Sequence, residues 1–210
     1  MEAARMADSI AIQHASLRLD KAKAAQERLE IATKREEIVS AWSDLLLAAA
    51  GVYSKLEQGS KTSGPGRAWY GRVKAERKAD PLLSYVHHAR NSDEHGIEEI
   101  VEVRKKGTAT ITFREPFDAT KLEGVQISVG RDNRGNVVVT SSNEDVATTK
   151  MYDRDQVELV TVKDSRFNDT FQPPYEHLGV KIEKQTPKEI GALLVDYIEN
   201  LLDSARTIGI

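Results

Sequence analysis

The sequence contains no cysteine, and this absence excludes several kinds of site at once. Without thiols the chain forms no disulfide, no thiolate zinc site and no cysteine nucleophile. Long apolar runs are missing as well: the longest, Leu45 to Val52, is far shorter than the roughly 20 residues that a membrane span needs. Charges at Arg5, Asp8 and Arg18 interrupt the first twenty residues, which lack the apolar core of a signal peptide. We therefore expect a cytoplasmic protein without a membrane partner.

A large excess of charge of one sign is also absent. The chain has 30 Lys and Arg against 33 Asp and Glu, which gives a formal net charge of -3. Charged residues make up 30% of the chain and hydrophobic residues 40%, a balance typical of amphipathic helices with solvated outer faces. The chain is no polycation, so any contact with RNA must come from a local basic patch.

Glycine and proline are missing from residues 2–50, where apolar residues recur at helical spacing. One apolar stripe covers residues 12–29 and a second covers residues 38–56. Because the two stripes are out of phase, the pattern predicts two helices joined by a turn; one long helix with a register skip is the alternative. A loop is predicted at residues 59–66, GSKTSGPG.

Three more helices are predicted from their end signals. A basic helix covers about residues 67–78, and the next begins with Asp80 as its N-cap and Pro81 as its first residue. That helix turns Leu83 and Val86 inward and ends near residue 95. The last helix begins at the capping box of residues 186–189, TPKE, and its apolar face has natural partners in the N-terminal helices.

From residue 97 the apolar period changes from helical to two, which predicts strands. We expect four to six strands in a small, mainly antiparallel sheet, with a loop at residues 168–179. The sequence as a whole predicts an α+β fold. Its helical domain takes residues 1–96 plus 186–210, and a β-rich module is inserted at residues 97–185.

Titratable side chains are concentrated in residues 85–96, YVHHARNSDEHG. Three of the five histidines of the chain lie here, at positions 87, 88 and 95. On a helix, Arg90 falls between Leu83 and Val86, among apolar residues. A guanidinium in that place needs a carboxylate, a phosphate or an interface, and Glu94 and Asp44 are the carboxylates that we consider. The spacing matches no strong template for metal ligands, so no metal or other cofactor is expected.

The run from Arg90 through Asn91 to His95 resembles the signature of the HEPN superfamily, an Arg, a polar residue and a His after a short gap. The resemblance covers about residues 30–96, with the C-terminal helix as a fourth member of the bundle. It implies a helical bundle that dimerises. It also implies a metal-independent endoribonuclease, a hydrolase of RNA in a toxin or phage-defence setting, with Arg90 and His95 catalytic and Asn91 supporting them.

The chemistry of metal-free RNA cleavage suits these residue types. The 2′-hydroxyl attacks the adjacent phosphate; His95 transfers the proton and Arg90 neutralises the charge that grows on the phosphate. The expected substrate-binding residues are basic and lie just before this segment, at Arg67, Arg72, Lys74, Arg77 and Lys78. Trp69 and Tyr70 beside them either stack on bases or belong to the core.

The partners expected from the sequence are RNA and a second copy of the chain. Leu46 and Tyr53 widen the second apolar stripe, which predicts another helical surface over it and a two-fold homodimer with residues 85–95 at or near the interface. The alternative is a non-catalytic dimeric module in which Arg90 is structural and the β-rich module binds a protein or a ligand. A carboxylate buried against Arg90 would favour this alternative, and an open cleft holding Arg90 with His95 would favour catalysis.

Overall fold

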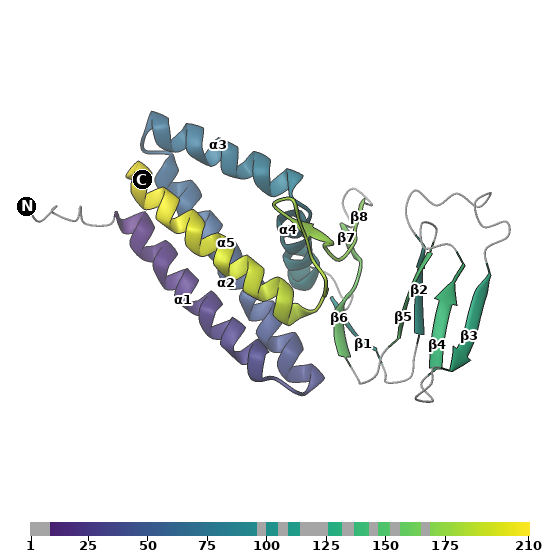
Figure 1. Cartoon of the computed structure of the whole chain (residues 1–210). Coiled ribbons are helices and arrows are strands. Elements are labelled where there is room, and N and C mark those ends of the chain that lie inside the picture. Colours follow the sequence, from purple (N-terminus) through teal and green to yellow (C-terminus); the bar gives the residue numbers. More distant parts are fainter. Residues whose placement is uncertain are drawn as a thin grey trace, which may run out of the picture. The chain divides into compact units, whose positions relative to one another are not determined.

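The computed structural model describes residues 9–95, 100–104, 109–113, 126–131, 137–142, 147–151, 156–164 and 169–210 (Figure 1). It confirms the α+β fold, with helices at both ends of the chain and short antiparallel strands between them. The chain divides into two compact units, of which one joins residues 1–102 with residues 157–210 and the other holds residues 103–156. Residues 157–185 thus belong with the helices, whereas the sequence suggested one β-rich module over 97–185.

The first unit begins with two antiparallel helices, α1 (Ile10–Ile31) and α2 (Arg35–Ser60). The turn between them confirms two helices in place of one long helix. Ser9 caps α1 by accepting a hydrogen bond from the backbone N–H of Ile12 at 3.2 Å. Glu37 accepts weak bonds of 3.4 Å from the backbone N–H groups of Thr33 and Lys34, so the start of α2 closes the turn.

Three further helices complete this unit: α3 (Gly64–Ala79), α4 (Pro81–His95) and α5 (Pro187–Ile208). The loop expected at residues 59–66 is shorter than predicted, because α2 continues to Ser60 and Ser63 already caps α3. Asp80 caps α4 as expected, accepting from the backbone N–H of Leu83 at 2.9 Å. Thr186 caps α5 as predicted, with its hydroxyl accepting from the backbone N–H of Glu189 at 3.3 Å.

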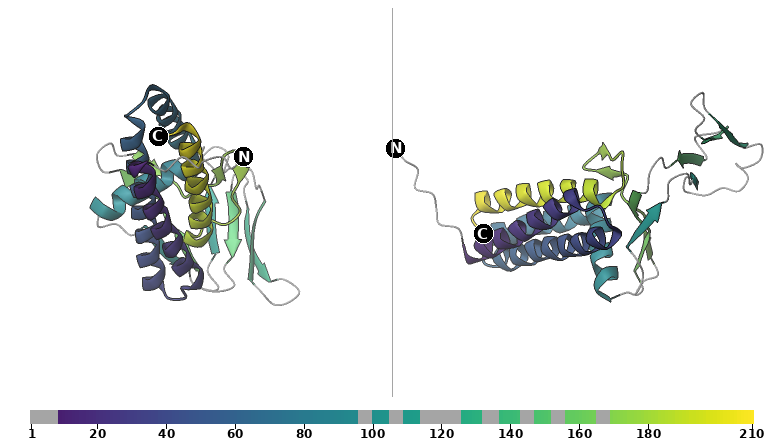
Figure 2. Two further views of the ribbon diagram at one scale, coloured as in Figure 1. Left: turned by 90° about the vertical axis from the view of Figure 1, so that its left-hand side faces the viewer. Right: turned by 90° about the horizontal axis from the view of Figure 1, so that it is seen from below.

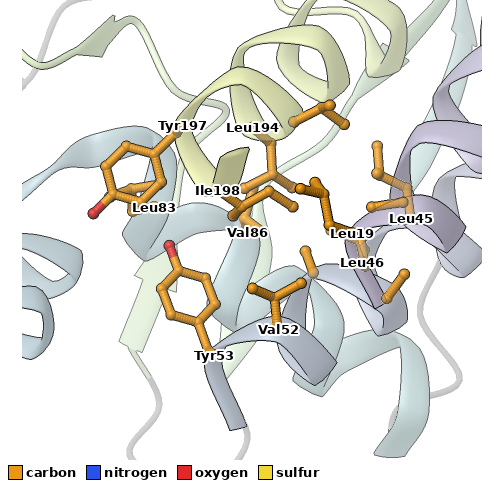
Figure 3. Packing of buried hydrophobic residues seen from close by; sticks show 14 of the residues in the cluster. Leu19, Leu45, Leu46, Val52, Tyr53, Leu83, Val86, Leu194, Tyr197 and Ile198 are labelled. Carbon is orange, nitrogen blue, oxygen red and sulfur yellow. The ribbon is translucent and has the colours of Figure 1, made fainter. Parts of the chain in front are cut away.

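The core lies where α1, α2 and α5 run alongside one another (Figure 2). Leu45, Leu194 and Ile198 are fully buried there (Figure 3). The expectation that Leu46 and Tyr53 leave a stripe for a second chain is wrong. Their exposed fractions are 1% and 5% within a single chain, because α4 and α5 already cover this face of α2.

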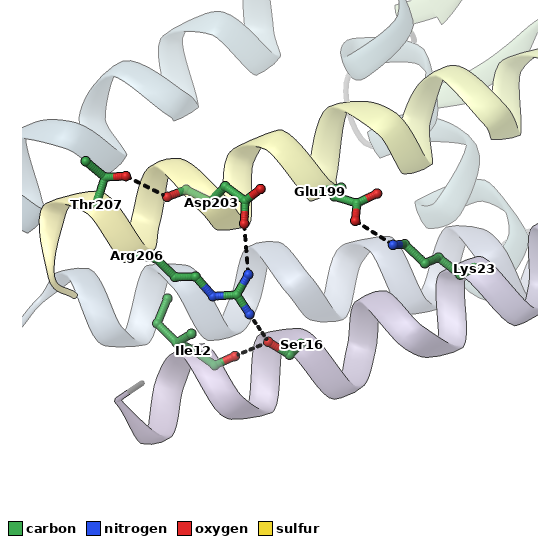
Figure 4. A network of polar contacts seen from close by, with 7 residues as sticks. All are labelled: Ile12, Ser16, Lys23, Glu199, Asp203, Arg206 and Thr207. Carbon is green, nitrogen blue, oxygen red and sulfur yellow. Dashed lines mark hydrogen bonds and ion pairs between the residues drawn. The ribbon is translucent and has the colours of Figure 1, made fainter. Parts of the chain in front are cut away.

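Polar contacts join the outer faces of α1 and α5 (Figure 4). Lys23 forms an ion pair of 2.6 Å with Glu199. Arg206 donates to Asp203 at 2.8 Å and to the hydroxyl of Ser16 at 3.0 Å. Such exposed pairs add little free energy each, so burial of the apolar faces is the main source of stability for this packing.

Short strands pair two by two in the described part of the chain. In the first unit β7 (Val162–Asp164) pairs with β8 (Asp169–Phe171), and β9 (Glu176–His177) with β10 (Val180–Lys181). The predicted loop at 168–179 therefore contains two of these strands. The pair of β1 (Val101–Arg104) and β6 (Gln156–Leu159) lies where the chain passes from one unit to the other.

Two antiparallel pairs lie among the described residues of the second unit, in the region where a period of two predicted strands. In one of them β2 (Ala109–Phe113) pairs with β5 (Ala147–Met151), with Ile111 opposite Thr149. In the other β3 (Ile127–Arg131) pairs with β4 (Val137–Ser141), with Val129 opposite Val139. No candidate site residue lies in this unit.

Candidate functional site

Helix α4 carries the motif residues, and its packing places Arg90. Leu83, Val86 and Ala89 are buried on the inner side of the helix. Arg90 is half-buried beside them, as the helical projection predicted. Its Nη1 lies 3.2 Å from the amide oxygen of Asn91, so the two neighbouring motif residues contact each other. Asp93, further along α4, accepts a hydrogen bond from Ser43 of α2, which fixes this part of the helix.

Arg90 lines a cavity of about 240 Å³ bordered by α2, α3 and α4, which we term the arginine cavity. Its polar lining comes from all three helices. The polar and aromatic residues of this lining include Tyr53, Glu57, Tyr70, Arg77, His87 and Arg90. Two expected site residues from different helices, Arg77 and Arg90, thus share one cavity.

The charged side chains that line the arginine cavity are those of Arg77, Arg90 and Glu57. Arg77 lies over the ring of Tyr53, with 4.9 Å from guanidinium carbon to ring centroid. Glu57 supplies a carboxylate, but Lys74 holds it in an ion pair of 2.6 Å. This hydrogen bond from Lys74 lowers the pKa of Glu57. Arg77 and Arg90 thus bring two guanidiniums to one cavity, and a guanidinium is the side chain best suited to bidentate contact with a phosphate.

The two tyrosines of the cavity are neutral at physiological pH. Burial raises the pKa of the Tyr70 hydroxyl to about 12, and it also raises the pKa of Tyr53 well above its ordinary value. The Tyr70 hydroxyl donates to the backbone carbonyl of Tyr53 at 3.0 Å, which ties α3 to α2. These rings therefore form a rigid wall and contribute no negative charge.

The histidine nearest to Arg90 in the cavity is His87, one helical turn before it. His95 is the last residue of α4, and an ideal helix places it about 140° around the axis from Arg90. The structure describes the backbone of His95 and not its side chain, so the contact between Arg90 and His95 stays a prediction. His88 faces elsewhere: its ring stacks on Phe171 of β8, with centroids 3.5 Å apart.

The five basic residues expected to bind substrate do not form one patch. Arg67, Lys74 and Lys78 are exposed and, by their spacing of seven and four, lie on one face of α3. Arg77 lines the arginine cavity, and Arg72 lines a different cavity on the other side of α3. A single strand of RNA could follow the first three residues toward Arg77, but Arg72 lies off that path.

Several side chains considered from the sequence belong to the framework. Trp69 and Tyr70 are both buried, and the Trp69 indole N–H donates to the hydroxyl of Ser204 at 3.0 Å, so the core interpretation holds for both. Asp44 forms an exposed ion pair of 2.9 Å with Arg28. Glu94, the other carboxylate considered for Arg90, has no described side chain. Within the described residues no group of three or more ligating side chains is arranged to hold a metal ion.

Sequence reasoning missed the part of the cavity that α2 contributes. Leu46, Ala50, Tyr53 and Glu57 follow one another at spacings of four, three and four, so they occupy one helical face. The sequence signal that could have indicated this wall is Glu57, a charged residue at the end of an apolar stripe. A charged side chain in that position lies at the edge of a buried surface, where it can line a cavity.

Comparisons with protein-family models, with curated proteins and with solved structures found no match. None of the helices in the described part of the chain has the length and apolar character needed to cross a membrane.

Proposed function

We propose that this protein is a metal-independent endoribonuclease whose reaction takes place at the arginine cavity. The observation that supports the proposal is that the Arg-Asn-His motif and the basic helix each contribute an arginine to one cavity. Arg90 comes from the helix of the Arg-Asn-His motif and Arg77 from the basic helix, and both line the same cavity together with His87. Two cations and an imidazole are the groups that phosphodiester cleavage without a metal requires.

The roles follow from the chemistry of each side chain. Arg77 and Arg90 bind the phosphate oxygens and stabilise the additional negative charge of the transition state. The 2′-oxygen bonds to phosphorus as one imidazole takes its proton, and the bond from phosphorus to the 5′-oxygen breaks. Water protonates the departing 5′-oxygen, and the hydroxide so formed recovers the proton from the imidazolium. The products are a 2′,3′-cyclic phosphate and a free 5′-hydroxyl. Asn91 keeps the guanidinium of Arg90 in place through the contact between them.

The identity of the proton-transferring histidine separates two versions of this mechanism. His95 is the residue that the motif assigns. His87 is the residue that shares the cavity with Arg90. Single substitutions of the two histidines distinguish these versions, because only the residue that transfers the proton contributes an acid–base effect of about 10²-fold or more.

The size of the cavity limits the part of the substrate that enters it. About 240 Å³ is below the range of roughly 300–1,000 Å³ usual for sites that enclose a drug-sized ligand. A phosphate with its ribose fits this description better than a complete base pair. Single-stranded RNA is therefore the proposed substrate, with Arg67, Lys74 and Lys78 along α3 as its electrostatic track.

The homodimer stays a prediction that rests on the resemblance to the HEPN superfamily. In that arrangement residues 85–95 of two copies lie at the interface, and the two Arg-His motifs lie side by side in one cleft. The argument from the width of the α2 stripe no longer supports it, since α4 and α5 cover that stripe within one chain.

The second candidate function is a non-catalytic interaction module. One observation favours it: Tyr175, Leu178 and Val180, around the β9–β10 turn, are all exposed apolar side chains. In this reading Arg90 stabilises the packing of α4, and the segment around β9 and β10 contacts a protein partner.

The test is incubation of the purified protein with a mixture of single-stranded RNAs in the presence of EDTA, with analysis of the product termini. We expect cleavage that leaves cyclic phosphates. Arg90→Ala should reduce the rate by about 10²-fold or more, whereas Arg28→Ala, on an exposed face of α1, should leave it unchanged. If no RNA is cleaved, or if Arg90→Ala cuts like the unmodified protein, the interaction module becomes the leading function.

A further inference from the structure

A second cavity, of about 590 Å³, lies between α3 and α5 and is bordered by the β9–β10 turn at His177 and Leu178. We term it the α3–α5 cavity. It shares no lining residue with the arginine cavity. Its volume is in the range usual for small-molecule sites, and its walls combine apolar surface with a few polar groups, as such sites do.

One border of this cavity is fixed by the buried carboxylate of Asp80, which has an exposed fraction of 6%. Besides capping α4, Asp80 accepts from the backbone N–H of Leu178 at 2.7 Å and lies 3.0 Å from Nδ1 of His177. Leu178 has a φ of 48°, which is unfavourable for a leucine. The carboxylate therefore holds a strained turn and orients an imidazole that is itself 9% exposed.

The long walls of the cavity are two helices joined by hydrogen bonds between their side chains. Trp69 of α3 donates its indole N–H to Ser204 of α5 at 3.0 Å. The hydroxyl of Tyr197 on α5 donates to Glu76 of α3 at 3.2 Å. Burial and the nearby Glu76 carboxylate raise the pKa of Tyr197 well above its ordinary value, so this hydroxyl keeps its proton.

These bonds engage the Trp69 and Tyr197 donors of the cavity, while carboxylate and amide oxygens remain on its wall. Nδ1 of His177 lies against the Asp80 carboxylate, so this contact occupies one of the two ring nitrogens. The side-chain amide of Asn200 donates to the backbone carbonyl of Asp196 at 2.9 Å, which leaves its oxygen. The carboxylates of Glu76 and Asp196 accept only. Among the lining residues Arg72 alone carries a fixed positive charge, on an exposed side chain.

We propose that the α3–α5 cavity binds a small organic cation, an ammonium group attached to a flat apolar body. The ammonium group donates to the carboxylates of Glu76 and Asp196. The flat body lies against the rings of Trp69 and Tyr197, which also attract positive charge. This site is independent of the proposed RNA cleavage, because none of its residues lines the arginine cavity.

The test uses phenethylammonium as the cationic probe and 3-phenylpropionate as an anion with the same ring. The readout is the indole N–H signal of Trp69 in an NMR titration of the full chain. The chain has one other tryptophan, Trp42, whose side chain is completely buried and lines neither cavity, so its indole signal is the internal reference. We expect phenethylammonium to shift the Trp69 signal in a saturable manner, and 3-phenylpropionate to bind much more weakly.

Variants of the charged lining residues test whether the cavity prefers a cation or an anion. Glu76→Gln combined with Asp196→Asn should weaken phenethylammonium about three- to tenfold, the range of two partly exposed ion contacts. Arg72→Ala should strengthen it by removing a like charge, whereas it would weaken an anion. Asp203→Asn is the matched control on α5, outside the cavity, and should change nothing. An unchanged Trp42 signal shows that each variant is folded.

Three results would overturn the proposal. The first is an absence of any Trp69 shift with phenethylammonium. The second is tighter binding of 3-phenylpropionate, which would make the cavity an anion site. The third is weaker binding of the cation in Arg72→Ala. His177→Phe tests the role of the imidazole in the same titration, because it keeps an aromatic ring and removes both ring nitrogens.

Discussion

The two cavities differ in charge and in how their residues are distributed along the chain, although both use α3. The arginine cavity is lined almost entirely by residues 46–90 and presents two guanidiniums. The α3–α5 cavity collects residues from 69 to 208 and presents mainly acceptors. Glu76 and Arg77 are neighbours in sequence, yet they line different cavities, because successive residues of a helix point about 100° apart. One short helix therefore separates two cavities for which we propose ligands of opposite charge.

The largest expected effect concerns the border of the α3–α5 cavity. Asp80→Ala removes the N-cap of α4. It also leaves the backbone N–H of Leu178 and Nδ1 of His177 buried without their hydrogen-bond partner. We expect a loss of about 2–4 kcal/mol in the free energy of unfolding, measured with urea. Asp80→Asn retains an acceptor and should lose about half as much. A loss below about 0.5 kcal/mol would mean that solvent replaces the carboxylate and that the border is not rigid.

The next effect sharpens the contrast in charge and concerns RNA binding. Reversal of Arg67, Lys74 and Lys78 to Glu removes the proposed track on the exposed face of α3. RNA affinity should fall about tenfold or more at low salt, and the slope of log affinity against log salt should decrease by about two. The same reversal at Arg18, Lys21 and Arg28, all exposed on α1, is the control. Equal losses in both variants would show that only overall charge matters.

A smaller effect tests the strained turn beside the α3–α5 cavity. Leu178→Gly removes the steric cost of a φ of 48°. The leucine side chain is 55% exposed, so its removal sacrifices little burial. We expect stability to rise by up to about 1 kcal/mol in urea unfolding. A decrease would show that Leu178 contributes more packing to the cavity wall than its exposure suggests.

The smallest effect lies in the arginine cavity and depends on pH. The hydrogen bond from Lys74 lowers the pKa of Glu57 in the folded chain, so the folded state binds this proton less readily than the unfolded state. The resulting stability is present above the unfolded pKa of 4.5 and disappears as the pH falls through the lower folded value. Because both side chains are partly exposed, we expect Glu57→Gln to cost at most about 0.5 kcal/mol at pH 7.

The pH comparison supplies the control for that prediction. Once the pH is below the lowered pKa of Glu57 in the folded chain, the unmodified protein and the Glu57→Gln variant should approach the same stability, since the carboxyl is then protonated in both states. Urea unfolding at the two pH values measures the difference. A gap that widens at low pH would contradict the assignment of the ion pair to Lys74.

Much of the helical structure could be predicted because its signals are local. The N-caps at Asp80 and Thr186 each depend on a few consecutive residues, and both are present. The apolar stripes of α1 and α2 likewise indicated which faces are buried. The candidate residues at Arg90 and Arg77 were found by type and spacing, but no local pattern indicated that one cavity would contain both.

The sequence by itself determined where helices begin and end, which faces are apolar, and that Asp80 would accept a hydrogen bond at the start of α4. Only the tertiary structure decided that the same carboxylate also contacts the ring of His177, 97 residues further along the chain. It also decided that α4 and α5 cover Leu46 and Tyr53, where the stripe alone indicated a second chain. The physical reason is that caps and periodicity depend on neighbouring residues, whereas the partner of a buried face depends on the packing of distant segments.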